Sequence, residues 1–239
     1  MNWRRRELPD RGPGRRSDSL EPVSTRPPAS TDPLEPLRSP QWLTEARRKA
    51  VHLAFIVLPL ELMLEILPWP RTRGQFRILF LLLTAGAIAL DVLRIHESRV
   101  RTFFRQFFGQ MIREHERLSL LGSTYLLLAA LIAVEVFPQP IAAAALGFTV
   151  LGDAMGALVG KAWGRHRFFN KSLEGVLGCF AACLVWGAFV VAMTDLPWPV
   201  VLAGAVTAAI VEALPIPLDD NLGITLAAGY AMKLLVVPN

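Results

Sequence analysis

Long apolar runs separated by short polar links fill the sequence after residue 45, and this pattern constrains the fold more than any other feature. A helix needs about 17 to 25 apolar residues to cross a bilayer, and seven runs reach or approach that length. The runs cover residues 51–67, 76–93, 120–137, 141–160, 173–193, 200–214 and 222–237. With 53% hydrophobic residues and a mean hydropathy of +0.40, the chain is too apolar for an ordinary soluble domain. We therefore predict an all-α, polytopic membrane bundle of about seven transmembrane helices.

The first 45 residues differ in composition from the rest. They are rich in Arg, Pro, Ser, Asp and Glu and show no apolar periodicity, as is typical of disordered segments. No hydrophobic stretch follows the early arginines, so we do not expect a cleavable signal peptide. The sequence predicts a disordered, basic, Pro-rich cytoplasmic tail over residues 1–45 and a transmembrane domain over residues 46–239.

Basic residues are distributed unequally between the links, and this asymmetry predicts the orientation. The second link carries six arginines, whereas the third and fifth links have no Lys or Arg. The fourth link carries Lys161, Arg165, Arg167 and Lys171. Because cytoplasmic links are enriched in Lys and Arg, we expect the amino terminus inside and the carboxyl terminus on the opposite side. The fourth and sixth links then share the cytoplasmic face of a cell inner membrane or an ER-type membrane.

Residues 99–113 predict an interfacial helix rather than a span. Apolar side chains alternate with arginines at helical spacing, which is typical of an amphipathic helix that lies in the membrane surface. The apolar set is Phe103, Phe104, Phe107, Phe108 and Met111.

Acidic residues stand at two informative places, one inside an apolar run and one in a link between two runs. Asp153 lies in the fourth run, and a charge at the bilayer centre costs about 2.5 to 3.5 kcal/mol, so this carboxylate needs a partner. That partner is Mg²⁺, water, a basic residue such as Arg165 or Lys171, or a helix end. Asp219 and Asp220 are adjacent in the sixth link, where a divalent cation or solvent is their expected partner. Asn221 follows and can orient one of them or bind a base or sugar.

The fourth link has the features of a phosphate site. Lys171 precedes Ser172 at the expected start of a helix, where free N–H groups and the helix dipole bind phosphate. Ser172 can cap this helix, and Gly175 in its first turn allows close backbone approach. Glu174 can stabilise the helix dipole or bind a metal. Positive-inside anchoring is the alternative explanation of the basic residues.

Taken in order, these motifs resemble those of the CTP-dependent lipid kinases, the family that includes dolichol kinase, phytol kinase and the CTP-dependent diacylglycerol kinases. The resemblance covers nearly all of residues 46–239. It rests on Arg48, Lys49, His52, Asp91, Arg94, Arg113, Glu116, residues 121–125, Gly152, Asp153, Ala154, Gly160, Gly164, Arg165, Lys171, Ser172, Glu174, Gly175, Asp220, Asn221 and Leu222. Part of the pattern is also similar to phosphatidate cytidylyltransferases, but the carboxyl-terminal signature of that family is absent.

The resemblance implies that the transmembrane domain transfers the γ-phosphate of CTP to the hydroxyl of a lipid alcohol, namely a polyprenol, a phytol-like alcohol or diacylglycerol. It implies Mg²⁺ bound by Asp153, Asp219 and Asp220. It implies CTP bound by Lys49, Gly152, Arg165, Lys171, Ser172, Glu174, Gly175 and Asn221. Asp153, Lys171 and Asp220 are the expected catalytic residues, and Asp220 is the candidate to accept the hydroxyl proton.

Two other functions stay open as alternatives. The first is a phosphatidate cytidylyltransferase that makes CDP-diacylglycerol. The second is a small membrane transporter or scaffold, although the sequence shows no repeated halves of the kind that transporters carry. The expected partners are CTP, a lipid alcohol and the bilayer, and no nucleic acid is expected.

Overall fold

A computed structural model describes residues 37, 39–109, 112 and 115–236. Its contacts divide the chain into units of residues 1–33 and 34–239, and all described residues fall in the second unit. Most of the predicted tail therefore lies outside the described residues. The first described helix begins at Pro40, and the predicted division after residue 45 stays a prediction.

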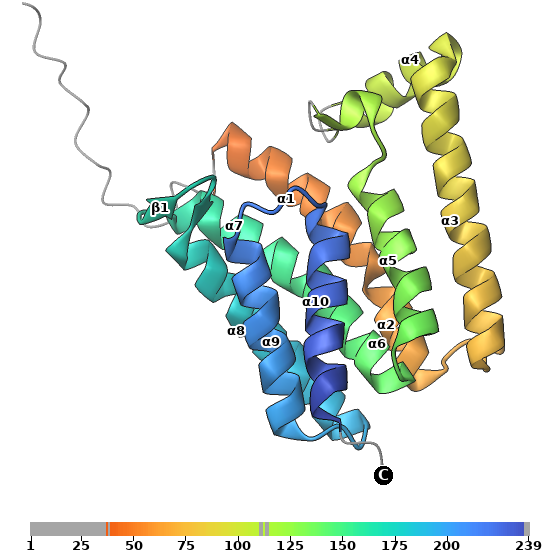
Figure 1. The fold of residues 1–239 in the computed structure, drawn as a ribbon. Coiled ribbons are helices and arrows are strands. Elements are labelled where there is room, and N and C mark those ends of the chain that lie inside the picture. Colours follow the sequence, from red (N-terminus) through yellow and green to blue (C-terminus); the bar gives the residue numbers. More distant parts are fainter. Residues whose placement is uncertain (1–36, 38, 110–111, 113–114, 237–239) are drawn as a thin grey trace, which may run out of the picture. The chain divides into compact units, whose positions relative to one another are not determined.

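Helices form nearly all of the described chain (Figure 1). They are α1 (Pro40–Leu53), α2 (Val57–Leu64), α3 (Arg73–His96), α4 (Ser98–Phe108), α5 (Gly122–Val136), α6 (Gln139–Gly147), α7 (Asp153–Trp163), α8 (Leu173–Met193), α9 (Trp198–Ala213) and α10 (Asp220–Leu235). Short helical turns are η2 (Ala54–Ile56), η3 (His115–Leu118) and the π-helical turn η4 (Phe148–Gly152). An antiparallel hairpin of β1 (Arg167–Phe168) and β2 (Lys171–Ser172) adds a small β element that the all-α prediction did not include.

Each of the seven predicted runs lies in or largely in helix, but the number of spans is not confirmed. By length and composition, three helical segments among the described residues can cross a membrane: Arg73–His96, Gln139–Trp163 and Leu173–Met193. Gly122–Val136 and Trp198–Ala213 are apolar but shorter. A 16-residue helix such as α9 is only about 24 Å long, less than the ~30 Å hydrocarbon thickness.

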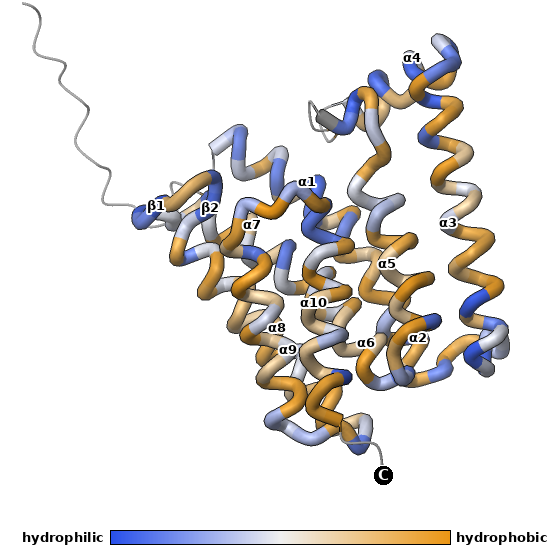
Figure 2. The backbone as a smooth tube through the Cα atoms, in the orientation of Figure 1, coloured by the Kyte–Doolittle hydropathy of each residue, from blue (hydrophilic) through white to orange (hydrophobic). Residues whose placement is uncertain are grey.

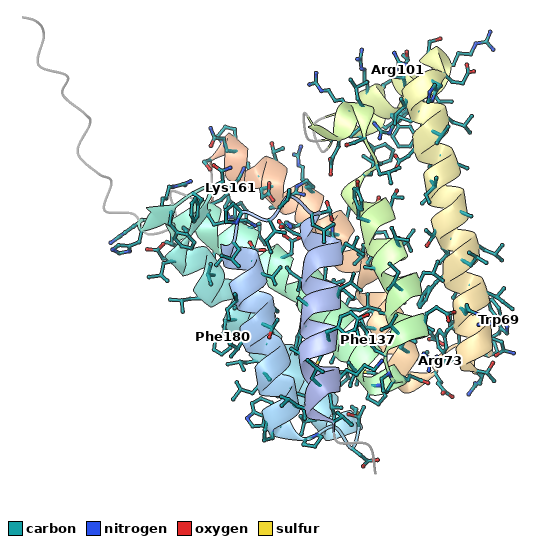
Figure 3. The ribbon with its side chains drawn as sticks, viewed as in Figure 1. Trp69, Arg73, Arg101, Phe137, Lys161 and Phe180 are labelled. Carbon is teal, nitrogen blue, oxygen red and sulfur yellow. The ribbon has the colours of Figure 1, made fainter. Side chains whose placement is uncertain are left out.

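The outer surface of the bundle is apolar along the sides of several helices. Figure 2 shows apolar residues along α3, α8 and α9, and polar residues at the ends of the helices. Leu82 on α3 and Val185 on α8 are largely exposed. Because water-soluble monomers rarely expose large apolar patches, this surface indicates a membrane protein. Figure 3 places Arg101 and Lys161 at one end of the helices and Arg73 at the other, but the predicted orientation across a membrane stays a prediction.

Capping side chains fix where four of the helices begin, because each accepts a hydrogen bond from a free backbone N–H of the first turn. They are Ser39 for α1, Thr72 for α3, Ser172 for α8 and Asp219 for α10. Ser172 fixes the start of α8 just after Lys171, and Asp219 makes Asp220 the first residue of α10. Local helix capping thus positions two polar residues at the same end of the bundle.

Small residues let α6, α7 and α8 approach closely around the core. Residues 141–146 of α6 are completely buried. A Cβ atom on Gly175 would lie 2.8 Å from the Gly156 carbonyl oxygen, so the α7 and α8 backbones are in contact there. The glycine spacing along α7 therefore serves helix packing. At the end of α6, the Trp186 indole fills the space that a side chain on Gly147 would need, and Trp186 Nε1 donates to the Ala143 carbonyl at 3.2 Å.

We expect Gly147→Ala to destabilise the protein by about 1 to 3 kcal/mol, because the added Cβ would lie 1.9 Å from Trp186 Nε1 and would force this buried ring to move. The melting temperature in detergent measures the effect. Gly86→Ala on α3 is the control, since nothing lies within 4 Å of its added Cβ, and its melting temperature should be unchanged or slightly higher. Equal melting temperatures for the two variants would contradict this account of the packing.

Candidate active site

Three carboxylates from three helices meet near one end of the bundle. Asp153 begins α7, Glu212 lies in the last turn of α9, and Asp220 begins α10. One oxygen from each lies within 4.8 Å of the other two. Asp153 and Glu212 are buried and Asp220 is partly buried. Three negative charges this close repel one another strongly, so the cluster needs cations to remain ionised.

Two lysines supply positive charge to this carboxylate cluster. Lys171 Nζ lies 2.8 Å from Glu212 Oε1 and 3.0 Å from Asp220 Oδ2. Burial by itself lowers the pKa of Lys171, but the carboxylates of Glu212 and Asp220 raise the pKa above its ordinary value, so this lysine is charged. Lys49 Nζ, on α1, donates to Asp153 Oδ2 from a position that is only 1% exposed. The charges on the two lysines are therefore held in place by the cluster.

The carboxylate cluster has the composition of a site for a hard divalent cation. All of its ligand atoms are carboxylate oxygens, which Mg²⁺ prefers. Glu212 Oε2 is buried and has no hydrogen-bond partner among the described residues, so one ligand oxygen is left unsatisfied. The residues present thus fit the predicted Mg²⁺. Asp153 and Asp220 are two of the three predicted ligands, and Glu212 is a further candidate ligand that the sequence analysis did not identify.

Asp219 lines a mainly apolar cavity together with Asp153 and Asp220 but is not one of the three clustered carboxylates, and its predicted metal role stays a prediction. Its Oδ1 accepts hydrogen bonds from the backbone N–H of Asn221 at 3.0 Å and from Asn221 Nδ2 at 2.8 Å, which caps α10. Burial raises the pKa of Asp219 above its usual value, although the two hydrogen bonds from Asn221 oppose the shift. Asn221 Nδ2 also donates to the Gly122 carbonyl at 3.1 Å, so it ties α10 to the start of α5.

A polar cavity of about 490 Å³ opens on one side of the carboxylate cluster, between α1, α7, α8 and the hairpin. Its lining includes four basic residues, Arg48, Lys161, Arg167 and Lys171, and the glycines Gly156, Gly160 and Gly175, of which Gly156 and Gly175 are buried. Lys161, at the end of α7 (Figure 3), lies 3.6 Å from Glu45 Oε2 at the rim. Ser172 also lines this cavity, and its Oγ accepts a hydrogen bond from the Gly175 N–H at 3.1 Å, as the predicted helix cap.

A second, mainly apolar cavity of about 430 Å³ opens on the other side of the carboxylate cluster, between α1, α3, α4 and the start of α5. Arg48, Asp153 and Asp220 line both cavities. The carboxylate cluster therefore stands at the boundary between a cationic space and an apolar space.

Four predicted residues of the described part of the chain line neither cavity: Lys49, which contacts Asp153 instead, Gly152, Arg165 and Glu174. Gly152 packs under α8, where its Cβ would lie 2.9 Å from the Cys179 and Cys183 sulfurs. Glu174 accepts hydrogen bonds from the backbone N–H of His166 and lies 2.8 Å from its Nδ1. Arg165 is in the same link but lines neither cavity. Their predicted roles in nucleotide binding stay untested predictions.

A buried network of hydrogen bonds joins α3 to the segment before α5, next to the apolar cavity. Asp91 on α3 pairs with Arg94 at 3.0 Å and accepts from the backbone N–H of Leu121 and from the Thr124 hydroxyl. Arg94 also donates to the Glu116 carbonyl at 3.1 Å. Asp91, Arg94 and Glu116 thus hold the segment before α5, which places Gly122 beside α10.

Two known proteins are similar to the chain. The CTP-dependent diacylglycerol kinase 1 of Schizosaccharomyces pombe is 28% identical over 162 residues, which make up 61% of this chain and 74% of that kinase. This similarity supports assigning the chain to the CTP-dependent lipid kinases. The family resemblance seen in the sequence motifs is thereby confirmed. An uncharacterized protein of Rickettsia prowazekii, RP860, is 24% identical over 201 residues, which cover 81% of this chain and 95% of that protein. No protein-family model matches the chain, and no solved structure matches it.

We expect Lys171→Met to increase the affinity of the protein for Mn²⁺ without nucleotide by about tenfold, equivalent to ~1.4 kcal/mol. The Lys171 ammonium lies against two of the three carboxylates, so its removal leaves them uncompensated and open to a metal ion. Binding of Mn²⁺ can be measured by electron paramagnetic resonance. Lys161→Met is the control, because it removes the same charge from the rim of the same cavity and should leave Mn²⁺ affinity nearly unchanged. Weaker Mn²⁺ binding by Lys171→Met would refute the metal assignment.

Proposed function

We propose that the protein is a membrane lipid kinase that transfers the γ-phosphate of CTP to the hydroxyl of a lipid alcohol. The observation that carries this proposal is the position of the carboxylate cluster at the boundary between a cationic cavity and an apolar cavity. The two cavities match the two substrates of such a reaction, because the phosphate donor is highly charged and the lipid is mostly hydrocarbon. The similarity to a CTP-dependent diacylglycerol kinase supports CTP as the donor and a lipid as the acceptor.

The polar cavity is the proposed nucleotide site. Its four basic side chains offset the negative charge of a triphosphate. A volume of about 490 Å³ lies within the range of small-molecule sites, which is about 300 to 1,000 Å³. Lys171, which stands beside the carboxylates, is the proposed contact for the phosphate that is transferred.

Asp153, Glu212 and Asp220 would hold Mg²⁺, which when bound offsets the charge of the phosphate oxygens. Lys49 holds the Asp153 carboxylate in place from α1. The Ser172 cap fixes the start of α8 and, with it, the preceding Lys171. The protein thus contributes mainly positioning and charge compensation, as is general for phosphoryl transfer.

Asp220 is the proposed acceptor of the hydroxyl proton. It borders both cavities and its side chain is 30% exposed, so an acceptor alcohol can reach it. As the alcohol oxygen forms a bond to the γ-phosphorus, the bond to the β-phosphate oxygen breaks and CDP leaves. The hydroxyl proton passes to the carboxylate and then to solvent.

Transfer of label from CTP tests the reaction directly. Purified protein with Mg²⁺, a panel of lipid alcohols and CTP labelled at the γ-phosphate should give labelled lipid. Label in lipid only from the α-phosphate, with phosphatidate as acceptor, would show a cytidylyltransferase instead. Transfer to no lipid, together with solute flux in vesicles, would favour a transporter.

We expect Glu212→Gln to lower kcat by at least about 100-fold, equivalent to ~2.7 kcal/mol in the activation barrier, because it removes one of the three charged ligands. The γ-label assay measures this loss. Glu61→Gln is the matched control: Glu61 is also a buried acid, but it lies on α2 and accepts hydrogen bonds from the backbone N–H of Leu67. Full activity of Glu212→Gln, or an equal loss in Glu61→Gln, would contradict the assignment of Glu212.

A further inference from the structure

The apolar cavity has one hydrocarbon-like wall and one polar end. Its wall includes Val51 and Phe55 from the first helical segments, Leu90 from α3, and Phe104 and Phe108 from α4. Its polar lining includes Asp153, Asp220 and Asn221, which come from the first residues of α7 and α10. A molecule that fills this cavity therefore needs an apolar chain with a polar group at one end.

The outer part of this wall is open to the surface of the protein. Val51 is 50% exposed, Leu90 is 47% exposed and Phe108 is 41% exposed, although all three line the cavity. Exposed leucines on α3, such as Leu82 and Leu83, extend the apolar surface away from this opening along the helix. A lipid can thus reach the cavity from the hydrocarbon phase of the bilayer without passing its chain through water.

An unsatisfied hydrogen-bond acceptor lies at the polar end. Asn221 is only 6% exposed, and its Nδ2 donates to both the Gly122 carbonyl and Asp219 Oδ1. Because both partners are acceptors, the amide orientation is fixed and Oδ1 must point away from them. Oδ1 is buried and has no hydrogen-bond partner among the described residues. A buried polar atom without a hydrogen-bond partner costs about 1 to 3 kcal/mol of folding free energy. A ligand that donates a hydrogen bond to this oxygen would remove that cost.

We infer that the apolar cavity binds the acceptor lipid, with the hydroxyl donating its hydrogen to Asn221 Oδ1 in the bound state. In the transfer step the same hydrogen moves to the neighbouring Asp220 carboxylate. This inference rests on the proposed function and adds where the second substrate lies and which side chain holds its reacting group. It changes the role predicted for Asn221 from nucleotide binding to acceptor binding. A lipid alcohol fits both ends of the cavity: its chain contacts the apolar wall and its O–H satisfies the amide oxygen.

Narrowing the cavity tests the location of the site. We expect Val51→Trp to raise the KM for the lipid alcohol at least tenfold and to change the KM for CTP less than twofold. Val57→Trp is the matched control, because Val57 is 52% exposed on α2 and lines neither cavity within the described residues, and both of its KM values should match the wild type. An unchanged lipid KM in Val51→Trp, or an equal rise in the KM for CTP, would overturn the inference.

A binding experiment separates this inference from the proposed reaction. A long-chain alkanol with a photoreactive diazirine is cross-linked to the wild-type protein without nucleotide, and the labelled residues are mapped. Labels on the wall of the apolar cavity, reduced in Val51→Trp but not in Val57→Trp, support the site even if no phosphate transfer is observed. Labels confined to other surfaces would reject the site even if transfer is observed.

The hydrogen bond to Asn221 can be tested with a paired ligand. The methyl ether of the alkanol has the same chain but no O–H donor, so the wild type should bind it about tenfold more weakly in competition with the photoreactive probe. In Asn221→Ala the ratio of the affinity for the alkanol to the affinity for its methyl ether should fall to about one. Because the readout is a ratio within each variant, a general loss of folded protein does not mimic the result. A ratio that persists in Asn221→Ala would show that another group holds the hydroxyl.

Discussion

The balance of charge between three clustered carboxylates and two lysines is the constraint on which the arrangement of this end of the protein depends. Asp153, Glu212 and Asp220 come from three helices and would repel one another if they were uncompensated. Lys171 reaches Glu212 and Asp220 from the hairpin, and Lys49 reaches Asp153 from α1. Helices α1, α7, α9 and α10 and the hairpin are thus joined by charge as well as by apolar packing.

Hydrophobic patterning predicted the helices well because each run keeps its apolar character over most of the helix. Run 173–193 coincides with α8, and run 141–160 corresponds to α6, η4 and most of α7. The β1–β2 hairpin was not predicted, since two strands of two residues leave no periodicity to detect. The number of spans cannot be derived from the runs, because α9 and α10 are too short to cross a bilayer of ordinary thickness without tilt or thinning of the bilayer.

The site was partly predictable because charges in apolar sequence are costly and therefore conspicuous. This argument found Asp153, and the adjacent acids of the sixth link drew attention to Asp220. The same argument applied to run 200–214 would have found Glu212, the acid near the end of that run. The directions of the side chains could not be predicted from the sequence. Asp219 and Asp220 are neighbours, yet Asp219 caps α10 and Asp220 joins the carboxylate cluster. The sequence also did not reveal that Glu174 accepts a hydrogen bond from the His166 N–H, because the hairpin brings His166 back to the start of α8; the predicted role of Glu174 in nucleotide binding stays a prediction.

The two cavities share Arg48, Asp153 and Asp220 but are otherwise lined by different residues. Two ligands can therefore occupy them at the same time and meet at the carboxylate cluster, so neither has to leave before the other enters. Under the proposed function, phosphate then passes directly from donor to acceptor without a phosphorylated protein intermediate. A single in-line displacement of this kind inverts the configuration at phosphorus. Under the proposed function, the separate linings of the two cavities thus predict inversion of configuration at phosphorus.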